Sequence, residues 1–232
     1  MQSGRCTTAS DFAGKTFVVR IDEATAQDAG ATLVGDLAVL AAHHVRPIVV
    51  APDPLAARAI VRAINRSANV ALALSGSDAA LLPDTPTGIG RVQTRILHTL
   101  TGAGFIPVVE PTAFALFGET DRAVVADDVA AAIAAATEAA RAIFFHRAGG
   151  VPDPQTNTVI GELTPAEALA LADDPRVDPE LRRAIRAAAT GVRAGIPAAQ
   201  ILDGRVAHAT VVEVLTSGHL GTQVTGGIIL AV

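Results

Sequence analysis

"RPIVVAPDPLAARAIVRAI" (residues 46–64) joins an uninterrupted apolar run to an amphipathic segment through a turn that contains two prolines. The apolar run predicts a buried β-strand, and the amphipathic segment predicts a helix that follows it directly. At the junction, Asp53 is suited to cap the helix and Pro54 to occupy its first position. A strand that leads straight into a helix is the repeating unit of an α/β protein.

The same alternation continues along the chain. Apolar runs predict strands at 15–21, 46–51, 69–76, 104–111, 141–147, 198–204 and 221–232. Helix-length segments lie between them at 27–44, 55–67, 92–103, 127–140, 165–172, 179–194 and 207–216. Because the strands are almost wholly apolar, both faces of the sheet should be covered. We therefore predict a single domain over residues 1–232, with an open, mostly parallel sheet and helices on both faces.

Two helix starts carry their own signals. Thr164 is placed as an N-cap, Pro165 as the first helical residue and Glu167 as the third residue of a capping box. Asp178 and Pro179 repeat the cap and proline before the next helix. Residues 151–164, which precede the first of these helices, are expected to form a small hairpin or loop.

Composition argues against several classes of function. The net charge of −5 and the 3% aromatic content, with no Trp or Tyr, leave no basic, stacking surface for nucleic acid. The most apolar helix, at 129–145, is interrupted by Glu138 and Arg141 and is too short to span a bilayer. The first residues contain no apolar secretion signal, and the single Cys6 cannot form an internal disulfide. We expect a soluble, cytoplasmic protein.

The C-terminal third carries a specific resemblance. "GELTPAEALAL" (161–171) and "GIPAAQILDGRVAHATVVEVLTSGHLGTQV" (195–224) resemble the end of the acetylglutamate kinases, which belong to the amino-acid kinase family. Upstream, "FAGKTFVVRIDEA" (12–24), "AINRSANVALALSGSDAALL" (63–82), "GRVQTRILHTLTGAGFIPVVEP" (90–111) and "VVADDVAAAIAAA" (124–136) resemble further family segments. The likeness covers nearly the whole chain.

This resemblance implies an αβα three-layer sandwich, with ATP and substrate side by side at the carboxyl edge of the strands. It also implies transfer of the γ-phosphoryl group of ATP to a carboxylate, with ATP and Mg²⁺ as cofactors. In such a reaction the catalytic groups are lysines, glycine-rich turns and one organising aspartate. Asp127 matches that aspartate, Arg20 stands in place of the first lysine, and Arg183 is adjacent to Ala184, which takes the place of the second.

The resemblance also suggests two binding regions. His146 and Arg147 lie where the family has a Ser/Thr-Asp pair on the adenine side, and Gly150 follows in a glycine pair that suits close approach of a nucleotide. In arginine-inhibited members, the effector site includes the residues that match His208, Glu213 and Gly221.

The catalytic half departs from the family pattern. The two glycines after the first lysine are replaced by Asp22 and Glu23, and the "HGGG" phosphate turn is replaced by residues 51–54. Ala123 and Val125 stand where two asparagines hold the acylamino acid. Only residues 55–63 occupy the place of the substrate lid and its arginine. These changes predict the loss of efficient phosphoryl transfer, since lost anion contacts cost many orders of magnitude in rate.

Three hypotheses follow. The first is a non-catalytic binding, regulatory or partner subunit related to arginine biosynthesis, which binds a small amino acid and forms a homo-oligomer or a hetero-oligomer with an intact kinase. The second is an active ATP-dependent kinase of a small (acyl)amino acid or related acid. The third is cation binding by clustered acids, although acids at strand–helix turns are usually caps. No metal-ligand spacing joins the histidines, so we predict no dedicated metal site. The acids of the third hypothesis are Asp22, Glu23, Asp53 and Asp127.

Overall fold

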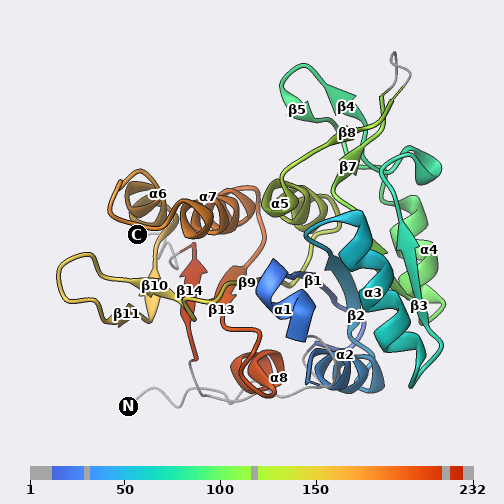
Figure 1. Cartoon of the computed structure of the whole chain (residues 1–232), viewed down its shortest axis with the longest axis horizontal. Coiled ribbons are helices and arrows are strands. Elements are labelled where there is room, and N and C mark those ends of the chain that lie inside the picture. The colour runs from blue at the N-terminus through green and yellow to red at the C-terminus, as the bar shows by residue number, and fades with distance from the viewer. Residues whose placement is uncertain (1–11, 29–31, 116–119, 216–219, 227–232) are drawn as a thin grey trace, which may run out of the picture.

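The computed structural model describes residues 12–28, 32–115, 120–215 and 220–226 (Figure 1). An eight-stranded sheet lies at its centre, in the order β12-β14-β13-β9-β1-β2-β6-β3. Every pair of neighbours in it is parallel except β13 and β14. This confirms the predicted α/β fold class. The strands are β1 (Thr16–Arg20), β2 (Arg46–Val50), β3 (Ala71–Leu74), β6 (Ile106–Val109), β9 (Arg141–Phe145), β12 (Glu162–Leu163), β13 (Ala198–Leu202) and β14 (Thr222–Thr225).

Helices cover both faces of the sheet, so the chain forms three layers (Figure 1). On β1, Val18 packs into one core, with residues of α4, α5, α6 and α7. Phe17 and Val19 point to the other face and pack with residues of α2 and α3. This alternation follows from the two-residue period of a strand. The helices are α1 (Glu23–Asp28), α2 (Thr32–Ala42), α3 (Pro54–Asn65), α4 (Arg95–Gly102), α5 (Ala126–Ala136), α6 (Pro165–Ala172), α7 (Pro179–Arg193) and α8 (Ala209–Leu215).

Short antiparallel ribbons extend from the carboxyl edge of the sheet. The ribbon of β10 (Val151–Pro152) and β11 (Val159–Ile160) confirms the predicted hairpin. Two further ribbons were not predicted, β4 (Asp84–Thr85) with β5 (Gly88–Ile89) and β7 (Thr112–Ala113) with β8 (Arg122–Ala123). Their strands are only two residues long, which is too short for a periodic pattern to show.

Some predicted boundaries are wrong. Residues 27–44 do not form one helix, because α1 ends at Asp28 and α2 begins at Thr32. The first of these helices starts early because the carboxylate of Asp22 accepts the Thr25 N–H at 2.9 Å and caps it. Helix α4 begins at Arg95 rather than at 92, and β14 ends at Thr225. The predicted end of that strand, 227–232, lies outside the described residues.

The predicted helix caps are confirmed. Asp53 accepts the Ala56 N–H at 2.9 Å, and Pro54 is the first residue of α3. In the capping box of α6, Thr164 accepts the Glu167 N–H while the Glu167 carboxylate accepts the Thr164 N–H. No helix within the described part of the chain is long and apolar enough to cross a membrane.

Replacing Thr164 by alanine tests this capping box. We expect Thr164→Ala to lower the free energy of unfolding by about 1 kcal/mol in urea titrations, the usual cost of losing such a cap. The hydrogen bonds from Thr164 lower the pKa of the Glu167 carboxyl. The part of the stabilisation that the Glu167 carboxylate supplies is therefore fully present above the ordinary glutamate pKa and is lost as the pH falls through the lowered pKa. Thr99→Ala, at an exposed position inside α4, serves as the control and should change stability little.

Gly76 offers a second test, because it follows β3 where the chain passes close to β7. A Cβ atom added there would lie 1.8 Å from the carbonyl oxygen of Thr112, so the backbone would have to move. We expect Gly76→Ala to destabilise the protein by roughly 2 kcal/mol or more in the same titrations, as overpacking does. Gly102→Ala, at the end of α4 with no atom within 4 Å, should be neutral or stabilising.

Candidate functional site

Arg20 and Asp127 form an ion pair at the carboxyl edge of the sheet. Arg20 is the last residue of β1, and Asp127 lies in the first turn of α5. The Arg20 Nε lies 3.1 Å from Asp127 Oδ1, and Nη2 donates to Oδ2 at 3.1 Å. The remaining nitrogen, Nη1, donates to the Phe145 carbonyl at 3.4 Å. Each nitrogen of the guanidinium group therefore faces an acceptor of the protein itself.

Arg183 reaches the same edge from α7. Its side chain is about half exposed and lies 3.9 Å from the Glu180 carboxylate, on the same helix. Burial raises the pKa of the Asp127 carboxyl, while the charges of Arg20 and Arg183 act to lower it. The charges of both arginines therefore act on Asp127, and Arg20 is the one that contacts it.

The helices after β1 and β2 begin at this edge, where phosphate-binding proteins often leave free N–H groups. Here a carboxylate occupies each start. Asp22, which is buried, accepts the Thr25 N–H, and Asp53 accepts the Ala56 N–H. Each acid takes up an N–H group and adds negative charge, so neither helix start fits the phosphates of a nucleotide.

His146 follows β9 and is buried, with 4% of its surface exposed. Its Nδ1 accepts the Ala148 N–H at 3.1 Å, and its Nε2 lies 3.8 Å from Asp178 Oδ1. Burial lowers the pKa of the imidazole, although the nearby Asp22 and Asp178 charges oppose this. Because Nδ1 accepts a hydrogen bond, the neutral ring carries its proton on Nε2.

His146, Asp178 and Glu180 are one group that could hold a metal ion. Their ligand atoms, one nitrogen and two carboxylate oxygens, all lie within 4.8 Å of one another. However, the protonated Nε2 has no lone pair to offer a metal. The Asp178 carboxylate also already accepts two backbone N–H groups as the cap of α7. This donor set does not fit a metal centre.

Three of the four acids that suggested cation binding have other partners. Asp22 and Asp53 cap helices, and Asp127 pairs with Arg20. Glu23 is exposed in the first turn of α1. Among the described residues, these four acids are not brought together as a group of ligand atoms.

Arg147 and Gly150 lie in the tight connection between β9 and β10. Arg147 is exposed, and its carbonyl accepts Arg205 Nη2 at 2.9 Å. A Cβ atom at Gly150 would lie 2.6 Å from a methyl group of Val159, and its φ of 153° disfavours other residues. Close packing of the hairpin therefore accounts for this glycine, and nucleotide contact at Arg147 and Gly150 stays a prediction.

The residues matching the effector site have partners within the protein. His208 Nδ1 lies 2.9 Å from Oδ1 of Asp36, a buried acid of α2. The Glu213 carboxylate accepts the Leu220 N–H at 2.7 Å. A Cβ atom at Gly221 would lie 2.2 Å from the Ile201 carbonyl, so glycine is required for close approach to β13. Glu213 thus binds the backbone of Leu220, the residue before Gly221, so these two positions lie close together. His208 instead contacts Asp36 of α2.

Asp36 was not identified from the sequence. Burial raises the pKa of its carboxyl, against the influence of His208 and the Thr210 N–H. It also accepts that Thr210 N–H at 3.2 Å, which ties α2 to the start of α8. The sequence feature that could have identified Asp36 is its position within the apolar segment "TLVGDLAVLAA" (32–42). A buried acid there needs a specific hydrogen-bond partner.

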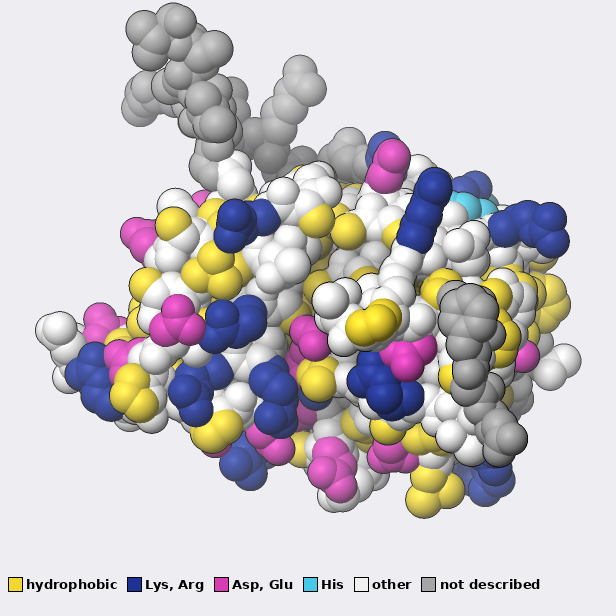
Figure 2. All heavy atoms as spheres, turned by 90° about the horizontal axis from the view of Figure 1, so that it is seen from above, with side chains coloured by type: hydrophobic (Ala, Val, Ile, Leu, Met, Phe, Trp, Pro, Cys, Tyr) yellow, Lys and Arg dark blue, Asp and Glu magenta, His cyan; other side chains and the backbone are white. Residues whose placement is uncertain are grey.

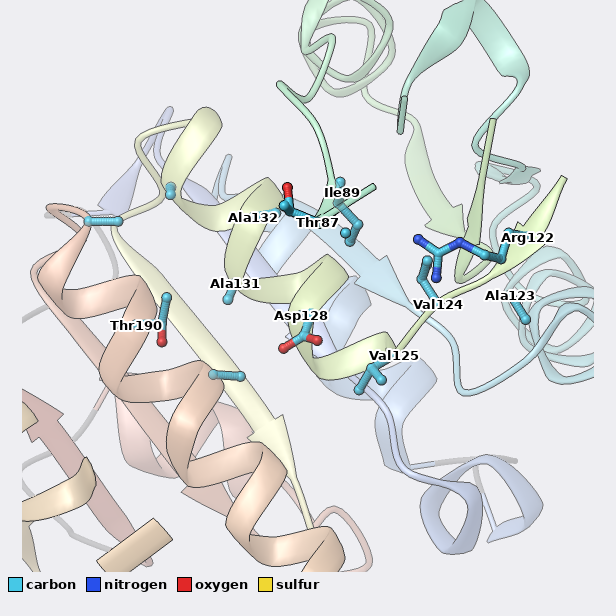
Figure 3. Close-up of a pocket in the computed structure, with 14 residues that line it drawn as sticks. Thr87, Ile89, Arg122, Ala123, Val124, Val125, Asp128, Ala131, Ala132 and Thr190 are labelled. Atoms are coloured by element: carbon cyan, nitrogen blue, oxygen red, sulfur yellow. The ribbon is translucent and has the colours of Figure 1, made fainter. Parts of the chain in front are cut away.

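A cavity of about 610 Å³ lies between α5, α7 and the β4–β5 and β7–β8 ribbons, and it too was not predicted (Figure 3). Its walls include Ile89, Val124, Val125 and several alanines, with Arg122 and Asp128 as the charged members. The lining comes from separate segments of the chain, so only the tertiary structure brings these residues together.

Comparisons with known proteins identify the family. The sequence profile described as "Amino acid kinase family" matches residues 21–202. An acetylglutamate kinase from Acidiphilium cryptum (strain JF-5) is 38% identical over 133 residues, covering 57% of this chain and 44% of that protein. One from Synechococcus sp. (strain CC9311) is 36% identical over 182 residues, covering 72% and 62%. The chain therefore spans less than two thirds of the length of these relatives.

Solved structures share the fold. The N-acetylglutamate synthase from Neisseria gonorrhoeae, complexed with coenzyme A and N-acetyl-glutamate, has a TM-score of 0.80 and 19% identity, covering 94% of this chain and 61% of that one. The carbamate kinase from Giardia lamblia bound to AMP-PNP has a TM-score of 0.64 and 11% identity, covering 92% and 99%. Profile, relatives and fold agree, and the chain is an acetylglutamate kinase-like protein that belongs to the amino acid kinase family.

Proposed function

We propose that this chain has lost efficient phosphoryl transfer and acts as a binding, regulatory or partner subunit. The observation that carries this proposal is that the guanidinium group of Arg20 is already paired with groups of the protein. In phosphoryl transfer, catalysis is mostly positioning and neutralisation of charge on the transferred group. A cation that serves this role must point donors at the phosphate. The three nitrogens of Arg20 instead face Asp127 and the Phe145 carbonyl.

The capped helices support the same proposal. A nucleotide whose phosphates approached the starts of α1 and α3 would meet the carboxylates of Asp22 and Asp53. One lost oxyanion donor costs about 10²–10³ in rate, so two lost phosphate turns remove roughly 10⁴–10⁶ before any repulsion is counted. A remaining ability to bind small molecules is compatible with these losses, because binding does not require the transition state to be stabilised.

One observation favours a second candidate, an active kinase. Asp127 is still paired with one cation, Arg20, and the charge of a second, Arg183, also acts on its carboxyl. This arrangement corresponds to the organising aspartate and two lysines that the resemblance implies. Such a kinase would use ATP and Mg²⁺ and would phosphorylate the carboxylate of a small (acyl)amino acid or related acid.

The partners are part of the proposal. A subunit without phosphoryl transfer would act by binding a small amino acid, by associating with another copy, or by associating with an intact kinase of the same family in the cytoplasm. At the positions matching the effector site, the Glu213 carboxylate would be the group to receive a cationic amino acid. Such a ligand would have to share it with the Leu220 N–H.

An ADP-release assay separates the two candidates. With Mg-ATP and a panel of N-acetylglutamate, other small carboxylates and carbamate, we expect no turnover above the background of ATP hydrolysis. An intact acetylglutamate kinase assayed in parallel is the positive control. Turnover that persisted in Glu138→Gln, an exposed acid after α5, but vanished in Asp127→Asn would establish the active kinase instead.

The ion pair itself predicts a stability effect. Asp127 is 2% exposed and Arg20 is 14% exposed, so removing the carboxylate leaves a largely buried cation without its partner. We expect Asp127→Asn to lower the free energy of unfolding by about 3–5 kcal/mol in urea titrations. The double variant Arg20→Met with Asp127→Asn should recover part of this loss, and Glu138→Gln should cost little. A more stable Asp127→Asn protein would instead indicate an acid kept for catalysis at the expense of stability.

A further inference from the structure

The side chain of His146 is enclosed at the carboxyl edge of the sheet, where the connection from β9 to β10 begins. Only 4% of the residue is exposed. Its Nδ1 accepts the Ala148 N–H at 3.1 Å, whereas its Nε2 has no hydrogen-bond partner among the described residues. A neutral imidazole offers one acceptor nitrogen and one N–H group. In His146 the backbone therefore uses the acceptor, and the N–H group on Nε2 is left unpaired.

Charged groups from three other segments act on this ring. They are Arg20 and Asp22 at the end of β1, Asp178 and Glu180 at the start of α7, and Asp203 after β13. The four carboxylates favour a protonated ring, and the guanidinium group of Arg20 opposes it. One carboxylate oxygen, Asp178 Oδ1, lies 3.8 Å from Nε2, so a positive charge on the ring would have a partner close by.

Burial outweighs these carboxylates. It is the strongest influence on the ring, and it lowers the pKa of the His146 imidazole below the ordinary histidine value of 6.5. On the face of the molecule that is seen from above, acidic and basic side chains are intermingled and neither sign dominates, so the groups near the ring decide its protonation (Figure 2). The ring is therefore neutral at neutral pH and takes up a proton as the pH falls.

Protonation changes what the ring can bind. An imidazolium carries an N–H group on both nitrogens and has no acceptor. Its Nδ1–H would point at the Ala148 N–H, so the hydrogen bond between them must break. At the same time Nε2 becomes a charged donor, which the nearby Asp178 carboxylate attracts. The neutral ring thus favours the backbone of Ala148, and the charged ring favours the carboxylate of Asp178.

The Ala148 N–H belongs to the tight turn between β9 and β10. The Gly149 N–H closes this turn by donating to the His146 carbonyl at 2.9 Å, and Arg205 Nη2 donates to the Arg147 carbonyl at 2.9 Å. Gly149 has a φ of 72°, a conformation that glycine adopts at little cost. A glycine at this position lets the turn take another course without moving β9 itself.

We propose that His146 is a pH-dependent switch for the connection at 146–150: the neutral ring holds this turn through the Ala148 N–H, and the protonated ring releases it and pairs with Asp178. Because burial lowers the pKa of the imidazole, the stabilisation of the turn is fully present above the ordinary histidine value of 6.5 and is lost as the pH falls through the lowered value. The switch requires no nucleotide and no phosphoryl transfer, so its success or failure is independent of the function proposed above.

Nuclear magnetic resonance of the whole chain tests the switch through amide hydrogen exchange and histidine titration. Between pH 8 and pH 5, the protection of the Ala148 amide, corrected for its intrinsic exchange rate, should fall about fivefold or more, while the amides of β1 keep their protection. The chemical shift of the Ala148 amide should titrate with the same midpoint as the His146 imidazole. Equal protection of Ala148 at the two pH values, or two different midpoints, would overturn the proposal.

Variants separate the proton of the ring from its packing. His146→Asn offers an amide oxygen as acceptor and does not titrate, so the Ala148 amide should stay protected at both pH values. His98→Asn, the matched change at an exposed histidine of α4, should leave the pH dependence unaltered. Asp178→Asn keeps a good cap for α7 but removes the charge that receives the protonated ring, so the midpoint should move to lower pH. This variant retains His146 and is therefore an independent test. A pH dependence that persisted in His146→Asn, or an unchanged midpoint in Asp178→Asn, would contradict the switch.

Discussion

The Arg20–Asp127 ion pair connects the end of β1 to the start of α5 across the carboxyl edge of the sheet. Both charges are largely withdrawn from water, so each depends on the other, and removal of one would leave the other uncompensated. The pair therefore constrains where α5 begins and how it lies against β1. Helix α5 in turn packs against α7, and together these helices cover one face of the sheet.

The same edge of the sheet is rich in carboxylates that perform structural roles. Asp22, Asp53 and Asp178 cap α1, α3 and α7, each by accepting backbone N–H groups at the helix start. A helix start with free N–H groups attracts anions, and one that carries its own carboxylate does not. In this family member, carboxylates of the chain itself cap the helices after β1 and β2, where the resemblance places the phosphates.

Predictions from the sequence were correct where all the interacting groups lie within one short segment. The Asp53–Pro54 and Thr164–Glu167 caps could be predicted because donor and acceptor lie within a few residues of each other. The two-residue strands of the ribbons could not, since no periodic pattern is that short. The division between α1 and α2 was also missed, because one helix was predicted over residues 27–44, whereas Asp22 caps a separate short helix that begins at Glu23.

Sequence patterns alone determined the α/β class, seven of the eight strands of the central sheet, the strongest caps and the family resemblance, because each depends on residue types at fixed spacing. The eighth strand, β12, lies within the predicted hairpin or loop at 151–164. Only the tertiary structure decided that Asp127 forms an ion pair with Arg20 and that Asp36 of α2 contacts His208. It also decided that Arg122 and Asp128 line one cavity. These contacts join residues far apart in the chain. Their existence depends on how the helices and ribbons pack around the sheet, which spacing along the sequence does not specify.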